Sequence, residues 1–198
     1  MPAGWDAILL KGMLIKVIDG DTFDADLDRN RKISGKKERI RLLYVDTPEL
    51  SDSHKEKNLY HGKPAKAFLA GMLSRPEPML WVSPDHARGN MGRLLGIVES
   101  AGVNVNLSLI VRGHSYFDTR YQWPQDFILY VSSEAEAFEA ERGIWSSRES
   151  RRFYLERLRG KGKTVYSRCN PLFMAKVRDA GSFELPRYRG ASSGSRVF

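Results

Sequence analysis

One ten-residue stretch, Ile40 to Glu49, constrains the fold of this chain more than any other segment. Its first six residues are mostly apolar and alternate in direction as a strand does, which predicts a buried strand. Arg41 lies inside this run, and burying an arginine is costly unless it meets an anion. Pro48 ends the strand because it has no N–H for the ladder, and this leaves Asp46 and Glu49 on either side of a turn.

These residue types together suggest a site for a hard cation beside a site for a phosphate. The carbonyl of Thr47 is released from strand pairing and adds a further oxygen. A simpler alternative is that Asp46 and Glu49 only form the turn, as acidic residues at strand ends often do. The arginine inside the strand favours the first interpretation, since turn formation does not account for it.

A second acidic segment precedes this one. Asp19-Gly20-Asp21 lies between apolar runs, which by itself indicates a hairpin turn. Together with the stretch 40–49 and with Gly92-Arg93, the segment 17–22 resembles the staphylococcal nuclease (thermonuclease) family. Weaker agreement continues through residues 105–106 and 143–145. The resemblance therefore covers residues 13–147, in the order and spacing of the family.

The resemblance implies a calcium site made of the Asp21 and Asp46 carboxylates and the Thr47 carbonyl. Calcium prefers such oxygen ligands and tolerates irregular geometry and bound water. Asp19 and Thr22 belong to the same motif, and we expect them to act in the turn or outside the ligand shell.

The resemblance also implies the groups that act on phosphate. Arg41 and Arg93 match two arginines that bind phosphate oxygens, for which a planar guanidinium is suited. Glu49 matches the carboxylate assigned as general base for the attacking water. Tyr121 falls near a family tyrosine that contacts the nucleotide, whereas a second such position is Thr119 here.

Other interpretations of these residues are weaker. Arg41 and Arg93 can be structural partners of Asp21 and Asp46, but the presence of every expected charged residue argues against this. A zinc site is not expected, because the histidines and the single cysteine lack ligand spacing; these are His54, His61, His86, His114 and Cys169. The segment 159–163 lacks the strand and helix that flank a phosphate-binding glycine loop.

The charge of the chain is concentrated at one end. The net charge is +8, yet residues 148–198 hold 13 Lys and Arg against 4 Asp and Glu, and residues 1–147 hold 19 against 20. The catalytic region is therefore not itself basic, and any broad attraction to nucleic acid would come from the C-terminal part. Whether that part binds nucleic acid or packs on the fold through Phe153 and Leu155 stays open.

The pattern of apolar residues predicts an α+β fold. Strands are expected at 7–17, 22–27, 38–45, 79–83 and 93–99, and helices near 64–75, 105–112 and 125–142. The resemblance selects a five-stranded OB-fold barrel with about three helices. We predict a catalytic domain over residues 1–147 and a basic, partly disordered C-terminal extension over 148–198.

These observations predict a calcium-dependent nuclease that hydrolyses DNA and RNA with low sequence specificity, and the resemblance to the family implies that it leaves 3′-phosphate ends. A noncatalytic nucleic-acid-binding OB-fold module is the alternative, and a partner-binding domain with a basic tail is a third hypothesis. No membrane association is expected, since no apolar run has membrane-spanning length. We expect a cytoplasmic protein, because the sequence opens without a signal-peptide pattern and one cysteine fits a reducing compartment. We also expect a monomer.

Overall fold

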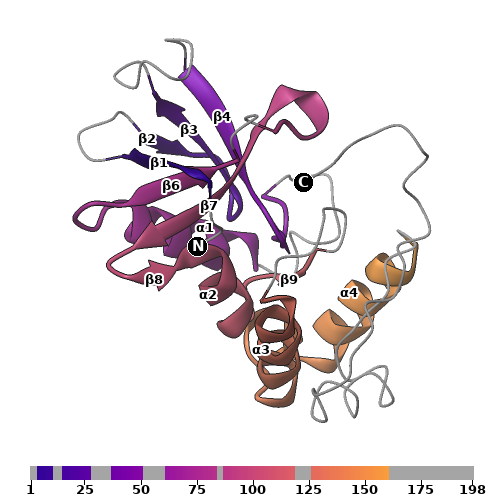
Figure 1. Cartoon of the computed structure of the whole chain (residues 1–198). Helices are drawn as coiled ribbons and strands as arrows, with labels where there is room; N and C mark the ends of the chain where they lie inside the picture. The colour runs from indigo at the N-terminus through magenta and orange to yellow at the C-terminus, as the bar shows by residue number, and fades with distance from the viewer. Residues whose placement is uncertain are drawn as a thin grey trace, which may run out of the picture.

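The computed structural model describes residues 4–10, 15–27, 37–50, 61–83, 87–118 and 126–160. Seven short strands in these ranges form one sheet (Figure 1). They are β1 (Asp6–Leu9), β2 (Ile15–Val17), β3 (Thr22–Asp26), β4 (Lys37–Leu42), β6 (Met79–Val82), β7 (Leu94–Ser100) and β8 (Val103–Asn104). The strand order is β1-β6-β7-β4-β3-β2, and β8 pairs with β7.

The centre of the sheet joins two distant segments of the chain. β4 lies parallel to β7, with Arg41 opposite Leu95, while it runs antiparallel to β3, with Arg41 opposite Thr22. Ile40 and Leu42 are fully buried beside Arg41. A central strand covered on both faces reads as a nearly continuous apolar run, which is why the stretch from residue 40 predicts it well.

A separate two-stranded ladder lies beside the sheet. β5 (Val45–Asp46) pairs antiparallel with β9 (Tyr116–Phe117), so that Asp46 is opposite Tyr116. A 3-10 turn, η2 (Asn90–Gly92), precedes β7, and a second one, η3 (Gly143–Trp145), follows the third helix. This small ladder carries Asp46, one of the two acidic residues of the stretch 40–49.

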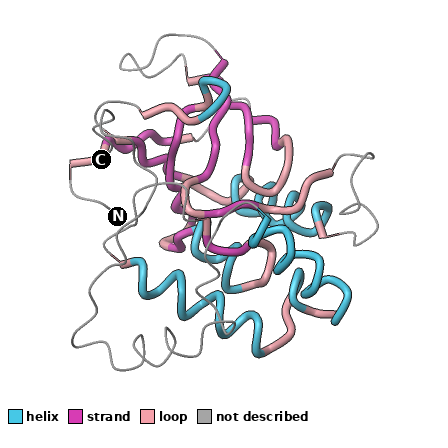
Figure 2. The backbone as a smooth tube through the Cα atoms, turned by 90° about the vertical axis from the view of Figure 1, so that its right-hand side faces the viewer, coloured by secondary structure: helices cyan, strands magenta, loops and turns pink. Residues whose placement is uncertain are grey.

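Four α-helices gather on one side of the strands, as Figure 2 shows with the helices in its lower part. They are α1 (Gly62–Leu73), α2 (Val105–Val111), α3 (Phe127–Glu139) and α4 (Arg148–Gly160). Pro64 lies in the first turn of α1, where its missing N–H costs nothing. Asn104 caps α2 by accepting a hydrogen bond from Leu107 N–H, and Gly113, with φ of 69°, follows the helix end.

The buried side chains form two clusters. The larger one lies between the sheet and α1 to α3. The smaller one contains Tyr116, Ala137, Ile144, Trp145 and Tyr154. Tyr154 comes from α4, and Ser150 of the same helix is fully buried. The first half of α4 is therefore packed onto the fold.

The α+β class is confirmed, with more elements than expected. The predicted first strand is two strands, β1 and β2, and a fourth helix follows the three predicted ones. Phe153 and Leu155 pack on the smaller cluster, as the packing alternative required. The boundary between residues 147 and 148 stays a prediction, and the extension beyond residue 160 lies outside the described residues. No helix in the described ranges is long and apolar enough to cross a membrane.

Candidate active site

The acidic turn between β2 and β3 is held by backbone hydrogen bonds. Ile18 N–H and Asp19 N–H both donate to the Thr22 carbonyl, at 2.9 and 3.2 Å, and Asp21 N–H donates to Asp19 Oδ1 at 3.1 Å. Gly20 is required by close approach, since a Cβ there would lie 2.5 Å from Ala65 Cβ and 2.7 Å from Thr47 Oγ1. The turn thus lies against both α1, through Ala65, and Thr47 of the stretch 40–49.

Asp21 is tied to Thr47 across 26 residues of sequence. Its Oδ2 accepts hydrogen bonds from Thr47 N–H at 2.7 Å and from the Thr47 hydroxyl at 3.1 Å. Its Oδ1 accepts from the Thr22 hydroxyl at 2.9 Å. Asp21 and Thr47 are both buried. The structure therefore brings Asp21 into contact with Thr47, whose carbonyl is the predicted third calcium ligand, and the Thr22 hydroxyl also donates to Asp21.

Arg41 lies between the two predicted aspartate ligands. Its Nη1 forms an ion pair with Asp21 Oδ2, and its Nη2 lies 3.1 Å from Asp46 Oδ1. A third carboxylate, that of Asp118, has Oδ2 at 4.0 Å from Nη2. The residue pattern argued against Arg41 as a structural partner of Asp21 and Asp46, and the structure corrects this, because Arg41 forms ion pairs with both. Burial explains the correction, because a guanidinium at 3% side-chain exposure needs anions beside it.

Asp46 is positioned by the strand opposite it. Its N–H donates to Ser115 Oγ at 2.8 Å, and the Tyr116 hydroxyl donates to its Oδ2. Asp118 N–H donates to the Tyr44 carbonyl at 2.9 Å, which continues the ladder by one residue. Tyr44 itself has φ of 67°, so the chain turns sharply just before Asp46.

Arg93 is presented by the turn before β7. Met91 and Gly92 have φ of 64° and 70°, and Arg93 is extended directly before Leu94. Because side chains alternate along a strand, Arg93 shares the face of Leu95, the parallel partner of Arg41. Arg41, on β4, and Arg93, directly before the neighbouring strand β7, are thus placed on one face of the sheet.

An ion pair anchors this turn to β4. Arg88 donates from Nη1 to Glu38 Oε2 at 2.8 Å and from Nη2 to Oε1 at 3.1 Å. Its Nη1 also donates to the Gly92 carbonyl at 2.8 Å. Arg88 therefore links β4 to the residue directly before Arg93.

Glu49 is exposed, unlike Asp21 and Asp46. It follows Pro48 at the point where the chain meets the start of α1. A Cβ on Gly62 would lie 2.8 Å from the Glu49 carbonyl and 2.9 Å from that of Pro48. The glycine at the first position of α1 is what allows the Pro48–Glu49 backbone to lie on the helix end.

The electrostatics of the site show an excess of negative charge. The pKa of Asp19 is raised to about 7, first by burial, then by the Asp21 carboxylate and also by Glu49. Carboxylates that repel one another in this way are relieved by a cation. The donor set of Asp21, Asp46 and the Thr47 backbone fits a hard cation chemically.

The site does not contain a ready-made cage of side chains. No group of three or more His, Cys, Asp or Glu side chains that would hold a metal ion occurs in the described ranges. The predicted set has only two carboxylates, Asp21 and Asp46, and both contact Arg41. A cation bound there would therefore share these carboxylates with the guanidinium.

The described residues thus bring Asp21, Arg41, Asp46 and Thr47 together, with Glu49 and Arg93 on adjoining segments. Tyr121 and Thr119 lie outside the described residues, so the nucleotide contact stays a prediction. The sequence reasoning did not identify Ser115, Tyr116 and Asp118. Only the two-residue pairing of β5 with β9 reveals them, and so short a strand leaves no recognisable pattern.

Comparison of the sequence with known proteins identifies related proteins. The family described as staphylococcal nuclease homologue matches residues 39–147. The chain is 31% identical over 169 residues to Endonuclease YhcR of Bacillus subtilis, and 31% identical over 139 residues to an uncharacterised protein of Bacillus anthracis. It is 30% identical over 149 residues to Protein ParB of Escherichia coli.

The chain therefore belongs to the staphylococcal nuclease family, whose OB-type architecture its sheet and helices share. The three alignments cover 79%, 69% and 69% of the chain. The chain itself spans 13% of the B. subtilis protein, 61% of the B. anthracis protein and 73% of the E. coli protein. Family membership thus rests on most of the chain, even though the B. subtilis relative is far longer.

Proposed function

We propose that this protein is a calcium-dependent nuclease that hydrolyses phosphodiester bonds in DNA and RNA. The observation that carries the proposal is the joint contact of Arg41 with Asp21 and Asp46, beside Thr47. Family membership and the name of the B. subtilis relative support the same reaction class. Low sequence specificity is part of the proposal, since the site residues address phosphate rather than bases. The 3′-phosphate products are part of it because the chain belongs to the staphylococcal nuclease family.

Asp21, Asp46 and the Thr47 carbonyl would hold the cation. A bound calcium would neutralise charge that develops on the phosphate and make a bound water more acidic. The hydrogen bonds from Thr47 N–H and the Thr47 hydroxyl to Asp21 hold the residue whose carbonyl would supply the third oxygen. Calcium accepts few protein ligands because water completes its shell.

Arg41 and Arg93 would bind the oxygens of the substrate phosphate. A guanidinium has five N–H donors, and two nitrogens of Arg41 already contact Asp21 and Asp46. The phosphate would compete with these carboxylates for the same guanidinium. Carboxylate oxygens of Asp21 and Asp46 that Arg41 releases would then be available to the cation. The same ion-pair network would thus bind both the cation and the phosphate.

Glu49 would act as the general base. It is exposed while the preceding residues Thr47 and Pro48 are buried, so water has access to it. Its carboxylate would accept a proton from the attacking water and the leaving oxygen would depart in line with the new bond. Gly62 holds the backbone of this residue against α1, which limits where the carboxylate can move.

Nicking of a supercoiled plasmid tests the proposal. Wild type should nick with calcium and stop when a calcium chelator is added. Glu49→Gln should lower turnover by about 10²–10⁴-fold while retaining DNA binding, because general base catalysis is worth that much. The exposed Glu139 on α3 offers a control, and Glu139→Gln should nick like wild type.

DNA binding without nicking by the wild type would overturn the nuclease and favour the noncatalytic OB-fold module. No affinity for nucleic acid at all would favour a partner-binding domain. Equal turnover in Glu49→Gln and wild type would remove Glu49 from the role of base. The same assay on an RNA substrate decides whether both nucleic acids are cleaved.

A further inference from the structure

We propose that Tyr116 is a positioning residue of the nuclease site, acting through Asp46. The Tyr116 hydroxyl donates a hydrogen bond to Asp46 Oδ2, while Asp46 Oδ1 lies 3.1 Å from Arg41 Nη2. The two oxygens of one carboxylate are thereby given separate partners. This inference rests on the proposed function, because it assumes that Asp46 is a cation ligand.

The backbone places the phenol where it can act. Asp46 and Tyr116 are direct partners in the β5–β9 ladder, and opposite residues of an antiparallel pair lie close enough for their side chains to interact. Asp46 N–H is held by Ser115 Oγ at 2.8 Å. The aspartate is therefore fixed both at its backbone and at its carboxylate by consecutive residues of the same short segment.

The phenol is itself fixed by packing. Tyr116 is 1% exposed and belongs to the smaller hydrophobic cluster, with Trp145 and Tyr154. A buried hydroxyl that donates to a carboxylate makes a charge-assisted bond, which is stronger than a bond between neutral groups. Asp46 is also buried, so water cannot readily replace the phenol. The cluster therefore sets the orientation of the Asp46 carboxylate.

The contacts of the Asp46 carboxylate have a consequence for a cation. The phenol and Arg41 contact different oxygens of this carboxylate, and a carboxylate has about four acceptor positions. Without the phenol, the Asp46 carboxylate can rotate and form a two-pronged pair with Arg41, in which both oxygens face the guanidinium. Groups that orient a metal ligand commonly change affinity or activity by about 10–100-fold when removed.

The same cluster contains a matched control. Tyr154 is also 1% exposed, and within the described residues its hydroxyl has no hydrogen-bond partner. Tyr154→Phe and Tyr116→Phe thus each remove one buried hydroxyl from the same group of aromatic rings. Only the second change removes a contact with Asp46.

Calorimetric titration with calcium alone tests the proposal. Tyr116→Phe should raise the dissociation constant for calcium by about 10–100-fold, and Tyr154→Phe should leave it unchanged. In plasmid nicking, the calcium response of Tyr116→Phe should shift to higher concentration, so that added calcium restores much of the turnover. A merely structural tyrosine would lower the cation-free melting temperature and leave the calcium affinity as it is, which overturns the proposal.

A second measurement on the wild type avoids dependence on the folding of a variant. The ring carbon that carries the hydroxyl of Tyr116 can be followed by NMR after carbon-13 labelling, and calcium should shift its resonance. No shift under saturating calcium would overturn the role of Tyr116 while leaving the nuclease proposal in place. If wild type binds no calcium at all, the proposed cation site fails first and this inference fails with it.

Discussion

Arg88 holds Glu38 with two parallel hydrogen bonds, from Nη1 to Oε2 and from Nη2 to Oε1, and reaches the Gly92 carbonyl with the same Nη1. Both terminal nitrogens of the guanidinium therefore have a defined acceptor. Glu38 is on β4, three residues before Arg41, and Gly92 directly precedes Arg93. This single side chain connects β4, which carries Arg41, to the turn that directly precedes Arg93.

Arg88→Lys should affect catalysis more than stability. The Arg88 side chain is 42% exposed, and such pairs contribute about 0–1 kcal/mol to stability. A lysine cannot bridge Glu38 and Gly92 in the same way, so Arg93 should be less well placed. We expect KM for DNA to rise about tenfold, equivalent to about 1.4 kcal/mol of binding.

Steady-state kinetics and thermal melts measure the two effects of Arg88→Lys. Arg142→Lys is the control, because Arg142 is 38% exposed and pairs with Glu136 at 2.8 Å in the helical part of the fold. If both variants leave KM unchanged, the Arg88–Glu38 pair does not place Arg93.

Arg41→Met should make folding depend on the cation. It leaves the Asp21 and Asp46 carboxylates buried without the guanidinium, and loss of one member of a buried ion pair typically costs about 3–5 kcal/mol. Calcium should then raise the melting temperature more in this variant than in wild type, since it replaces the missing positive charge.

The control for Arg41→Met lies two residues away on the same strand. Arg39 has a side chain 54% exposed and pairs with Asp24 at 2.7 Å, so Arg39→Met should change stability little. Differential scanning calorimetry with and without calcium gives the comparison. An equal response to calcium in Arg41→Met and wild type would show that the cation does not bind at Asp21 and Asp46.

Glu134 should make the protein more stable at mildly acidic pH. Burial raises its pKa to about 8, with the Phe117 N–H donating to Oε1 at 3.2 Å and opposing the shift. Because the pKa in the folded state exceeds the ordinary glutamate value of 4.5, folding takes up a proton. Its contribution to stability is present below pH 4.5 and is lost as the pH rises to about 8.

Glu134→Gln should remove this pH dependence. The amide still offers an acceptor to Phe117 N–H but does not ionise. Denaturant unfolding from pH 4.5 to 8 should show a slope that is shallower in the variant by up to ~1.4 kcal/mol per pH unit. Glu139→Gln, at an exposed position of the same helix, should keep the wild-type slope. An identical slope in Glu134→Gln would mean that Glu134 ionises normally.

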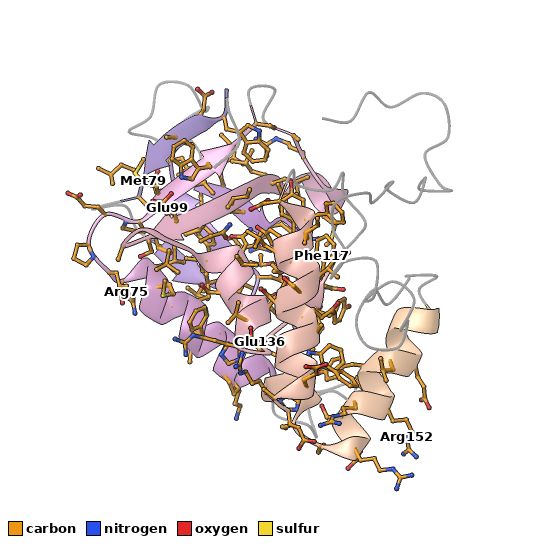
Figure 3. The ribbon with its side chains drawn as sticks, turned by 60° about the horizontal axis from the view of Figure 1, so that its bottom comes forward. Arg75, Met79, Glu99, Phe117, Glu136 and Arg152 are labelled. Atoms are coloured by element: carbon orange, nitrogen blue, oxygen red, sulfur yellow. The ribbon has the colours of Figure 1, made fainter. Side chains whose placement is uncertain are left out.

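Removal of α4 should unfold the protein or weaken it strongly. A chain ending at Ser147 lacks Ser150 and Tyr154, which are buried, and loss of one large aromatic side chain from a core typically costs about 3–5 kcal/mol. A chain ending at Gly160 retains the helix and should melt near wild type. In Figure 3, Arg152 extends from α4 away from the rest of the fold, so its charge is not part of this packing.

Circular dichroism melts of the two truncated chains decide the point. Equal melting temperatures would show that α4 is dispensable. The longer truncation product also tests the basic extension: if residues 161–198 attract DNA electrostatically, their removal should flatten the salt dependence of DNA binding.

Periodicity predicted the three helices and most of the strands because each buries a broad apolar face. The fourth helix was missed for a physical reason. Its sequence from residue 148 is dominated by charged residues, and within residues 148–156 the fully buried positions are Ser150 and Tyr154, one helical turn apart. Its apolar and charged residues lie on different faces, but the helix is so polar overall that its composition predicts an exposed tail. Only the folded structure shows that this helix packs on Trp145 and the rest of the smaller cluster.

The site was predictable where residues are close in sequence. Arg41, Asp46 and Thr47 lie in one stretch, and family spacing adds Asp21. The partners that fix their geometry are far away in sequence and chemically ordinary. Tyr116 reads as a core aromatic, and its role emerges only from the β5–β9 register. The contact of Arg41 with both aspartates depends on burial, which the residue pattern alone does not quantify.

The hydrogen bond from Tyr116 to Asp46 spans 70 residues, and Tyr116 belongs to the same buried cluster as Tyr154, further along the chain. A ribosome-bound chain therefore holds Asp21, Arg41 and Asp46 long before it holds the residues that arrange them. If the proposed nuclease activity depends on this arrangement, it should appear only once α4 has emerged and folded.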